Sequence, residues 1–446
     1  MHVIIIGAGT GGLCLAQALK RDGITVEVYE RDRTRTDGLF GYRVGVSPDG
    51  SRALADCLPA DLFETFKATT AITPRYFNIL TEKYAEVLSL DGFDEVKPDD
   101  PAAERSVSRM TLRQVLLTGL ETDVHFDKTF SRYQQHDDGT VTAFFEDGST
   151  ATGDLLVGAD GTWSGVRRQY LPDAQLKETD LFGITAKLPL TDDTRKLLTS
   201  KVLRGVSMVT APKGYSAIIH VMEFPWDHNG AVKIGVGGND ADLLNAWPGL
   251  NFDNTRDYIM LGFGGHQRYL PENLMDLDGA ALHKVMLDRT ATWHPNLRKL
   301  FELADPTTCF PINIRTSTRV DPWPTSNVTL IGDAIHTMTP GLGVGANTAL
   351  RDAQNLSRDL AAAANGEMTV LEAVAEYEKQ MNAYAWDAVE KSRERFSGDA
   401  VSFKPGIGRL ALALSRTGMR LVNNLPPVKK KIKASMSAER SHNHNE

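Results

Sequence analysis

The N-terminal stretch is the feature that most restricts how this chain can fold. An apolar run at 2–6 leads into Gly7-Ala8-Gly9-Thr10-Gly11-Gly12, and a helical pattern of apolar residues follows. A second apolar run, 24–29, ends at Glu30. A strand, a G-x-G-x-x-G turn, a helix and a second strand ending in an acid are typical of a Rossmann-like unit that binds a dinucleotide. The alternative is a glycine-rich turn in another kind of α/β domain.

Each part of this pattern has a physical task. Gly7 permits a tight turn, Gly9 lets a pyrophosphate approach the backbone, and Gly12 lets the helix pack on the sheet. Glu30 is suited to the two ribose hydroxyls of an adenosine, and its charge would repel a 2′-phosphate, which favours FAD or NAD over NADP here. The cofactor contacts predicted from this stretch are Gly7, Gly9, Thr10, Gly11, Gly12, Glu30 and Arg31.

A second stretch, 328–352, has a related order. A short β-branched run ends at Gly332-Asp333, a loop rich in proline and glycine follows, and a helix begins near Ala346. The carboxylate can accept hydrogen bonds from a sugar or ribityl hydroxyl, and the helix start offers free N–H groups and partial positive charge to an electron-rich ring such as a flavin. The cofactor contacts predicted here are Asp333, Pro340, Gly341, Gly343, Gly345, Ala346 and Asn347.

Three further segments contain candidate cofactor residues. An apolar strand at 155–157 precedes Asp160, and a helix is predicted to begin near Ser164. Arg43 lies in a glycine-rich segment, 37–49, which is either a mobile loop over a ligand or an ordinary connection. Arg109 and Arg113 lie on one side of a predicted helix over 106–120, where such a pair suits a phosphate or ribityl chain, or is simply surface charge.

The predicted fold class is α/β: a Rossmann-like FAD-binding domain, an inserted substrate domain on a mixed or antiparallel sheet, and C-terminal helices. Strands of the second sheet are predicted at 181–188, 215–221 and 232–236. Its polar candidates are more often structural than catalytic, and no catalytic residue is singled out among Tyr215, His220, His228 and His266. The predicted FAD-binding parts are 1–75, 102–175 and 278–368, the substrate parts 76–101 and 176–277, and the C-terminal helical region with its basic tail 369–446.

Composition excludes several functions. A net charge of −8 gives no indication of nucleic-acid binding, and the three scattered cysteines show no metal-binding spacing. A reduced, cytoplasmic protein without a leader or a membrane span is expected. Residues 400–438 contain eight basic residues and no acid. A basic helix at 408–422 is expected to cross the acidic body of its own chain, and contact with anionic lipid is the less favoured alternative.

Three motifs now stand in order: GAGTGG with Glu30, the Ala159-Asp160-Gly161 segment ending in Arg167, and the Gly332-Asp333 stretch with its Pro-Gly loop. Together they resemble the single-component FAD-dependent aromatic hydroxylases, the family of p-hydroxybenzoate hydroxylase. The RVGV at 43–46 is similar to that family's mobile-flavin segment. The usual GDAAH of the family is GDAIH here, with isoleucine at 335.

The resemblance implies roles for the candidates. Glu30 would bind the adenosine ribose, and Arg109 or Arg113 the FAD chain. Asp160 belongs to a motif linked to both FAD and NAD(P)H. Asp333 would bind the ribityl or pyrophosphate region, and 340–347 would line the isoalloxazine.

The resemblance also implies the chemistry. NAD(P)H would bind transiently and reduce the flavin, and O₂ would form a C4a-hydroperoxide that hydroxylates an aromatic or polyketide-like small molecule, as in secondary metabolism. The alternatives are a halogenase, whose W-x-W-x-I-P segment is not found, a reductase, and a non-redox cyclase that keeps FAD as a structural element.

Overall fold

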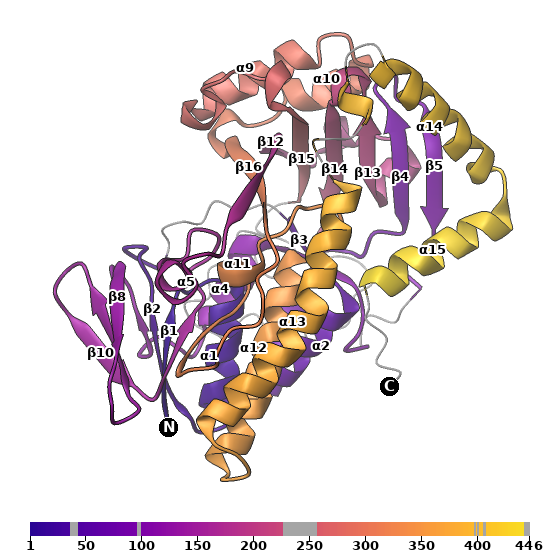
Figure 1. Cartoon of the computed structure of the whole chain (residues 1–446). Helices are drawn as coiled ribbons and strands as arrows, with labels where there is room; N and C mark the ends of the chain where they lie inside the picture. Colours follow the sequence, from indigo (N-terminus) through magenta and orange to yellow (C-terminus); the bar gives the residue numbers. More distant parts are fainter. Residues whose placement is uncertain are drawn as a thin grey trace.

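The computed structural model describes residues 1–35, 43–95, 100–225, 257–396, 398, 401–404 and 407–440 (Figure 1). Two large sheets organise these residues. One is parallel and lies near the N-terminus, and the other lies beside α9 and α10 in Figure 1. This arrangement confirms the predicted fold class.

The parallel sheet has five strands, and its central members are fully buried. Apolar runs such as Val3–Ile6 are covered on both faces, as parallel sheets require. The strands that lead into the three cofactor motifs therefore lie side by side in one sheet, and the prediction of these strands is confirmed. Its order is β17 (Val328–Leu330), β11 (Leu155–Gly158), β1 (His2–Ile6), β2 (Thr25–Tyr29) and β7 (Val124–His125).

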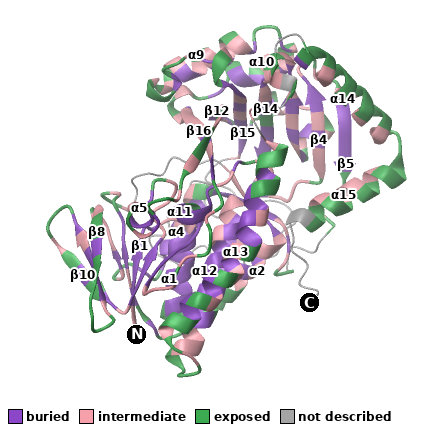
Figure 2. Cartoon of the chain, viewed as in Figure 1, coloured by how far each residue is buried: buried purple, intermediate pink, exposed green. Residues whose placement is uncertain are grey.

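Helices cover this sheet from the side on which Figure 1 shows α1, α12 and α13. The long helix α12 packs against α1, α2 and α13, and their apolar faces join the sheet in one core (Figure 2). The helices are α1 (Thr10–Arg21), α2 (Pro48–Cys57), α3 (Ala60–Ala68), α4 (Arg109–Leu117), α12 (Gly345–Ala364) and α13 (Val370–Arg395).

A three-stranded antiparallel sheet packs on the same core. It consists of β8 (Phe130–Gln135), β9 (Val141–Phe145) and β10 (Thr150–Gly153), with α5 (Gly165–Tyr170) beside β8. Strands β9 and β10 form the hairpin that the alternating pattern around Asp147-Gly148 predicts.

The second large sheet has seven strands, all antiparallel to their neighbours except β13 and β4, which are parallel. The strands predicted at 181–188 and 215–221 correspond to β12 and β14, whereas β13 and β15 were not predicted. The strand predicted at 232–236 lies outside the described residues, as does His228. The order is β16 (Phe310–Ser317), β12 (Leu176–Pro189), β15 (Tyr258–His266), β14 (Ser216–Met222), β13 (Gly205–Thr210), β4 (Tyr76–Thr81) and β5 (Glu86–Asp91).

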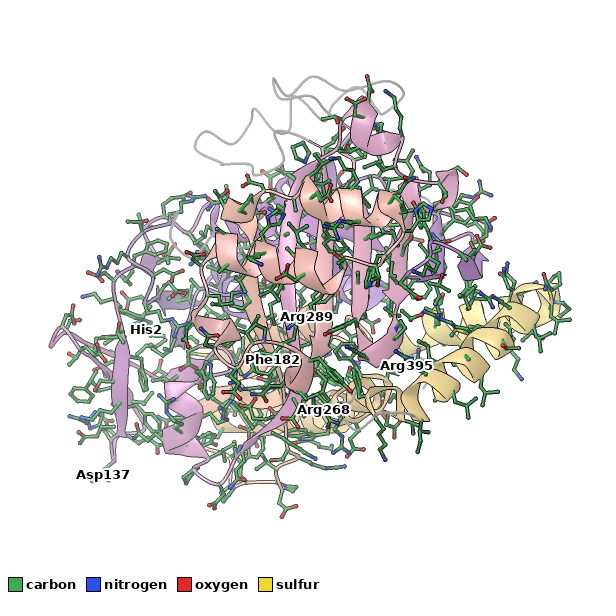
Figure 3. All side chains as sticks on the ribbon, turned by 90° about the horizontal axis from the view of Figure 1, so that it is seen from above. His2, Asp137, Phe182, Arg268, Arg289 and Arg395 are labelled. Atoms are coloured by element: carbon green, nitrogen blue, oxygen red, sulfur yellow. The ribbon has the colours of Figure 1, made fainter. Side chains whose placement is uncertain are left out.

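Helices α9 (Gly279–Arg289) and α10 (Pro295–Glu302) cover one face of this seven-stranded sheet, which Figure 3 views from above. The helical pattern over 278–303 corresponds to two helices in the structure. The second helix begins at Pro295, whose ring fits the first helical turn. Both helices share the core of the seven-stranded sheet rather than that of the parallel sheet. The predicted boundary at 278 assigns these two helices to the FAD-binding part, whereas they pack on the seven-stranded sheet. The other domain boundaries stay predictions.

The remaining elements are short or peripheral. A two-stranded sheet pairs residues 43–46 with the strand before α4. Among the described residues, no group of acids, histidines or cysteines is arranged to hold a metal ion. None of the described helices is long and apolar enough to cross a membrane. These elements are β3 (Arg43–Val46), β6 (Arg105–Ser108), α6 (Asp192–Arg195), α7 (Ser200–Leu203), α11 (Asp333–His336), α14 (Ile407–Asn423) and α15 (Pro426–Arg440).

Candidate cofactor and substrate site

Three carboxylates predicted to bind the cofactor come together at one edge of the parallel sheet. Glu30 follows β2, Asp160 follows β11, and Asp333 follows β17. Because these strands are parallel to β1 and lie side by side, their carboxyl ends share an edge. Ligands of open α/β sheets bind at this edge.

The glycine turn between β1 and α1 is built to the geometry that its sequence predicts. Gly7 has a φ of +110°, which glycine adopts readily, and its N–H donates to the Tyr29 carbonyl at 2.8 Å. A Cβ at Gly12 would collide with the Gly7 carbonyl oxygen, so the helix approaches the strand closely. Gly11 would bring a Cβ within 3.3 Å of Ala349, which ties α1 to α12.

Glu30 and Arg113 belong to one network around this turn. Glu30 Oε2 accepts the Ala8 N–H at 2.7 Å, and Oε1 accepts the Asp32 N–H at 3.0 Å. Arg113 pairs with Asp32 at 3.0 Å and donates to the Ala8 carbonyl at 3.2 Å. Arg31 is exposed. The structure therefore places Arg113, rather than Arg109, against the glycine turn.

Asp160 caps the helix that follows it. Its Oδ2 accepts the N–H groups of Gly165 at 2.6 Å and Val166 at 3.3 Å, while Oδ1 is buried without a partner among the described residues. Burial raises the pKa of this carboxyl. Arg167, the last residue of the motif, donates to the Ala334 carbonyl at 2.8 Å, and burial lowers the pKa of its guanidinium. Through this hydrogen bond the motif of Asp160 and Arg167 contacts the segment that follows Asp333.

Asp333 follows a turn that requires glycine. Gly332 has φ +61° and ψ −144°, a conformation that other residues rarely adopt. The Asp333 side chain is exposed, although protein is packed densely around it. That crowding raises the pKa of the carboxyl, and the charges of His336 and Arg109 oppose the rise. Because the side chain reaches solvent, we expect Asp333 to be ionised at neutral pH.

A buried network that sequence reasoning missed holds this turn. Asp352, on α12, is fully buried and accepts the Gly332 N–H at 2.7 Å and the Tyr384 hydroxyl at 2.5 Å, and its Oδ2 lies 2.6 Å from His336 Nε2. Burial disfavours the imidazolium, but the negative charges of Asp352 and Asp333 outweigh it and raise the pKa of His336. The sequence signal that could have revealed this network is an acid, Asp352, on the apolar face of a predicted helix.

Asn347 joins the Pro-Gly loop to β3. Its Oδ1 accepts the Ser47 N–H at 2.8 Å, and its Nδ2 donates to the carbonyls of Gly45 at 2.9 Å and Gly343 at 3.2 Å. Arg43, in β3, donates to Ser106 Oγ at 3.1 and 3.0 Å. The predicted flavin segments at 43–46 and 340–347 therefore lie against each other.

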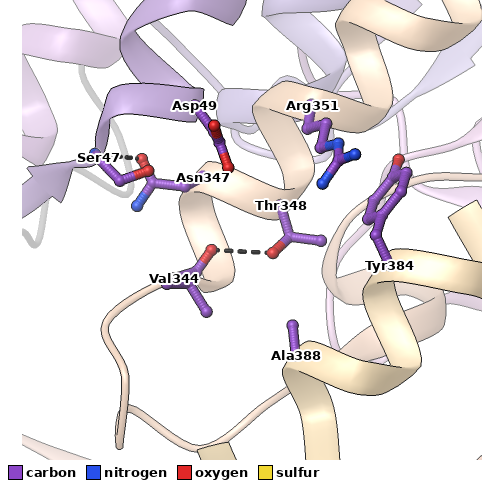
Figure 4. A pocket seen from close by; sticks show the side chains of 8 residues that line it. All are labelled: Ser47, Asp49, Val344, Asn347, Thr348, Arg351, Tyr384 and Ala388. Carbon is purple, nitrogen blue, oxygen red and sulfur yellow. Dashed lines mark hydrogen bonds between the residues drawn. The ribbon is translucent and has the colours of Figure 1, made fainter. Parts of the chain in front are cut away.

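A small cavity, partly open to solvent, lies behind the first turn of α12 (Figure 4). The Arg351 guanidinium stacks over the Tyr384 ring there, with its carbon 4.0 Å from the ring centre. The cavity lies between the β3–α2 turn, α12 and α13, so it adjoins the elements that hold the Asp333 turn. Its lining consists of Ser47, Asp49, Val344, Asn347, Thr348, Arg351, Tyr384 and Ala388.

The N-termini of α1 and α12 are both open for a ligand. Gly9 and Val344 occupy the cap positions, no side chain caps either of these two described helices, and neither has an acid in its first turn. Free N–H groups and partial positive charge therefore face outward from both helix starts. Pyrophosphate at one and an electron-rich flavin ring at the other fit this donor set, and Glu30 and Asp333 supply acceptors for hydroxyls.

Helices α9 and α10 cover one face of the seven-stranded sheet, and the opposite face points toward the FAD-binding part. Met222 and Met260 on this face pack against Ala68 and Ala71 at the end of α3. Side chains alternate along β14, so His220 lies on this face, whereas its neighbours Ile219 and Val221 face α9 and α10. The seven-stranded sheet thus contacts the FAD-binding part across this face.

Part of that face carries no side chains. Gly183, Gly262 and Gly264 share it, because β15 pairs Gly264 with Gly183 and Gly262 with Ile218 across the strands. Among the described residues, a Cβ at Gly262 would meet only Ile218, at 3.7 Å, so none of them fills the space above this glycine. We call these three glycines the glycine patch. Ile218, beside the patch, is 41% exposed.

His220 is the buried polar group next to the glycine patch. It is 1% exposed, and neither ring nitrogen has a hydrogen-bond partner among the described residues. Burial lowers the pKa of His220 well below its usual value, and the charge of Arg43 adds to this. The other polar candidates have partners: the Tyr215 hydroxyl donates to the Tyr269 carbonyl at 3.1 Å, and His266 Nδ1 accepts the Arg268 N–H at 3.3 Å.

Comparison with known proteins identifies the family. A family model described as an FAD binding domain matches residues 1–232 and 303–392, which include all three motifs. The chain belongs to this FAD-binding family. This membership confirms FAD as the cofactor and the predicted resemblance to p-hydroxybenzoate hydroxylase-like monooxygenases.

Curated relatives of this family member are named as monooxygenases. The dual O-methyltransferase/FAD-dependent monooxygenase CTB3 of Cercospora beticola is 34% identical over 86% of this chain, and the chain spans only 44% of that relative. The FAD-dependent monooxygenase thnD of Trichoderma harzianum is 29% identical over 91% of this chain and 95% of its own. The FAD-dependent urate hydroxylase of Klebsiella pneumoniae is 29% identical over 89% of both chains.

Solved structures show the same fold. A protein of Photorhabdus luminescens, assigned as an FAD-containing monooxygenase, has a TM-score of 0.74 and 32% identity, with 89% of this chain and 98% of that chain covered. Klebsiella pneumoniae HpxO complexed with FAD and uric acid also has a TM-score of 0.74, at 24% identity, over 99% of this family member and 96% of HpxO. The latter supports the fold alone.

Proposed function

We propose that this protein is an FAD-dependent monooxygenase that uses NAD(P)H and O₂ to hydroxylate an aromatic or polyketide-like small molecule. The observation that carries the proposal is the bare glycine patch with His220 beside it, on the sheet face turned toward the FAD-binding part. A flat ring can lie on exposed backbone, and a buried histidine without a partner can bond one polar group of that ring.

The chain's own residues would hold the cofactor at the carboxyl edge of the parallel sheet. Glu30 and Asp333 would accept hydrogen bonds from cofactor hydroxyls, and the open starts of α1 and α12 would donate to its pyrophosphate and its ring. When bound, reduced FAD supplies the activation of O₂. The relatives' names support this assignment, since urate, a flat heterocycle, is the substrate in the name of one of them.

His220 would orient the substrate rather than remove its proton. Because burial and the nearby charge of Arg43 keep its pKa low, the imidazole is neutral at neutral pH and is a weak base. A neutral imidazole both donates and accepts one hydrogen bond. One of these bonds can go to a phenol or enol hydroxyl of the substrate, and such substrates are electron-rich where oxygen is inserted.

The test is oxygen transfer by the purified yellow protein. NADH and NADPH oxidation would be followed with a panel of phenols and polyketides, and product mass would be recorded. We expect substrate-stimulated oxidation and a product heavier by one oxygen. Turnover of any substrate without oxygen incorporation would overturn the proposal in favour of a reductase or cyclase, and chloride-dependent halogenation would identify a halogenase. A cytoplasmic location stays a prediction; all three cysteines are free and buried.

A further inference from the structure

The C-terminal helices α14 and α15 attach to the body through their polar sides. Arg416 pairs with Glu82 at 2.5 Å, Asn423 Oδ1 accepts the Ser89 N–H at 3.0 Å, and Lys433 pairs with Glu95 at 3.1 Å. Helix α14 runs beside β5, the edge strand of the seven-stranded sheet (Figure 1). The expectation that this basic segment crosses its own acidic body is confirmed for these contacts.

The opposite side of these helices exposes a row of large apolar side chains. A helix at the surface of a soluble protein normally buries its apolar stripe and exposes its polar one. Here the order is reversed, as the exposed outer surface of α14 in Figure 2 illustrates. The row recurs at intervals of three, four or seven residues along one side, and its exposed fractions are 61% for Ile407, 62% for Leu410, 66% for Leu414, 64% for Leu421 and 49% for Leu425. We call this row the outer stripe.

Basic side chains accompany the outer stripe without acidic partners. Arg409, Arg420, Lys430 and Lys431 are exposed and form no ion pair with any described residue. Arg416 on the inner side is paired, and Arg409 lies two turns before it on the same side of α14. No acid occurs between 400 and 438, whereas the whole chain has a net charge of −8. Four exposed basic residues that form no ion pair with a described residue therefore lie on the same two helices as the outer stripe.

We propose that the outer stripe docks on an anionic lipid surface, with α14 and α15 lying in the plane of the interface. Leucines would enter the boundary between headgroups and acyl chains, and the unpaired basic residues would contact anionic headgroups. A second copy of the chain is a poorer occupant. A symmetric dimer through this stripe would place the same unpaired basic residues against each other.

The test is binding of the full, FAD-loaded chain to vesicles. Co-sedimentation would compare pure phosphatidylcholine vesicles with vesicles that also contain about one-third phosphatidylserine. We expect binding only to the anionic vesicles, with affinity falling as salt rises. The triple variant Leu410→Ser/Leu414→Ser/Leu421→Ser should bind about 100-fold more weakly, because three apolar side chains no longer enter the lipid.

Matched controls separate this surface from general stickiness. Leu371→Ser on α13 removes another leucine, 50% exposed, and should leave vesicle binding unchanged. The variant Arg409→Gln/Arg420→Gln/Lys430→Gln/Lys431→Gln should lose binding while its flavin spectrum and thermal unfolding match those of the parent. No binding to anionic vesicles, equal binding to neutral ones, or undiminished binding by the leucine variant would overturn the proposal. A parent dimer that the leucine variant converts to monomer would assign the stripe to self-association instead.

Discussion

Two buried histidines, one near each large sheet, differ in their hydrogen-bond partners and in the direction of their pKa shifts. His336, at the cofactor edge, is fully buried 2.6 Å from a carboxylate oxygen of Asp352, and its pKa is raised although Nδ1 has no partner in the described part of the chain. His220, on the seven-stranded sheet, is nearly as buried, but neither nitrogen has a partner among the described residues and its pKa is lowered. A buried polar group with a protein partner holds the fold, whereas one without a partner is suited to a ligand.

The glycines of the cofactor edge and those of the glycine patch differ in a similar way. At Gly7 and Gly12 a side chain would collide with backbone, so these glycines are required by packing. At Gly262 a Cβ would meet only Ile218 among the described residues, at 3.7 Å, so none of them packs on the backbone there. The cofactor edge is therefore determined by packing within the protein, whereas the glycine patch borders space that no described residue fills.

The largest expected effect is at the partnered histidine. Asp352→Ala removes the acceptor of the Gly332 N–H and of Tyr384 and leaves His336 buried without its counter-charge. We expect a loss of about 3–5 kcal/mol in the free energy of unfolding, measured by urea denaturation. The exposed Asp321→Ala is the control and should change stability by less than about 0.5 kcal/mol. A loss below about 1 kcal/mol for Asp352→Ala would contradict the structural role of this network.

The next effect separates cofactor binding from folding. Asp333→Ala removes an exposed carboxylate, so the apo-protein should keep its stability within about 1 kcal/mol. FAD affinity should fall about 100-fold, because hydrogen bonds from cofactor hydroxyls to a charged group are lost. Flavin fluorescence titration measures the affinity. Full FAD occupancy in this variant would show that Asp333 does not bind the cofactor.

Sequence reasoning reached the cofactor edge because its signals are local. The turn at Gly7–Gly12, the acid at Glu30 and the Gly332-Asp333 turn each follow from a strand, a backbone conformation or a helix start within a few residues. The structure places these segments at one edge, although they are about 300 residues apart in the chain. The roles of the individual side chains stay predictions.

The same reasoning failed where partners come from distant strands. Strand β15 contains Gly262, Gly264 and Gly265, which lower strand propensity, and only its pairing with β12 and β14 makes it a strand. Asp352 resembles an ordinary helical acid until the fold brings it to His336. The glycine patch exists only through cross-strand register, which no local pattern specifies.

A smaller effect follows at the unpartnered histidine. His220→Phe removes a buried polar group without a partner, so stability at pH 7 should stay the same or rise by about 1 kcal/mol. In contrast, kcat/KM for the hydroxylated substrate should fall at least about tenfold, with FAD content unchanged. His336→Phe is the matched variant and should lose stability. A loss above about 2 kcal/mol for His220→Phe would show that the imidazole serves the fold.

The two histidines should also have opposite effects on the pH dependence of stability. The lowered pKa of His220 means that below about pH 6.5 the unfolded chain takes up a proton that the folded chain does not, so acid destabilises the parent. His220→Phe should weaken this acid-side loss. The raised pKa of His336 contributes stability that is present below about pH 6.5 and lost as the pH rises through the raised value. Urea denaturation at pH 5.5, 7 and 8.5 of the parent and both variants would detect both trends.

The smallest effect tests the glycine patch. Gly262→Ala places a methyl group in open space beside Ile218, so stability should change by less than about 1 kcal/mol and FAD should bind as in the parent. The KM for a flat substrate should rise several-fold, because a methyl group about 2 Å in radius lifts the ring from the backbone surface. Gly12→Ala is the counter-test, since its Cβ has no room and both folding and FAD binding should suffer. Equal outcomes for the two substitutions would mean that the patch, like the turn, is a packing requirement, and the contrast between the two sheets would no longer hold.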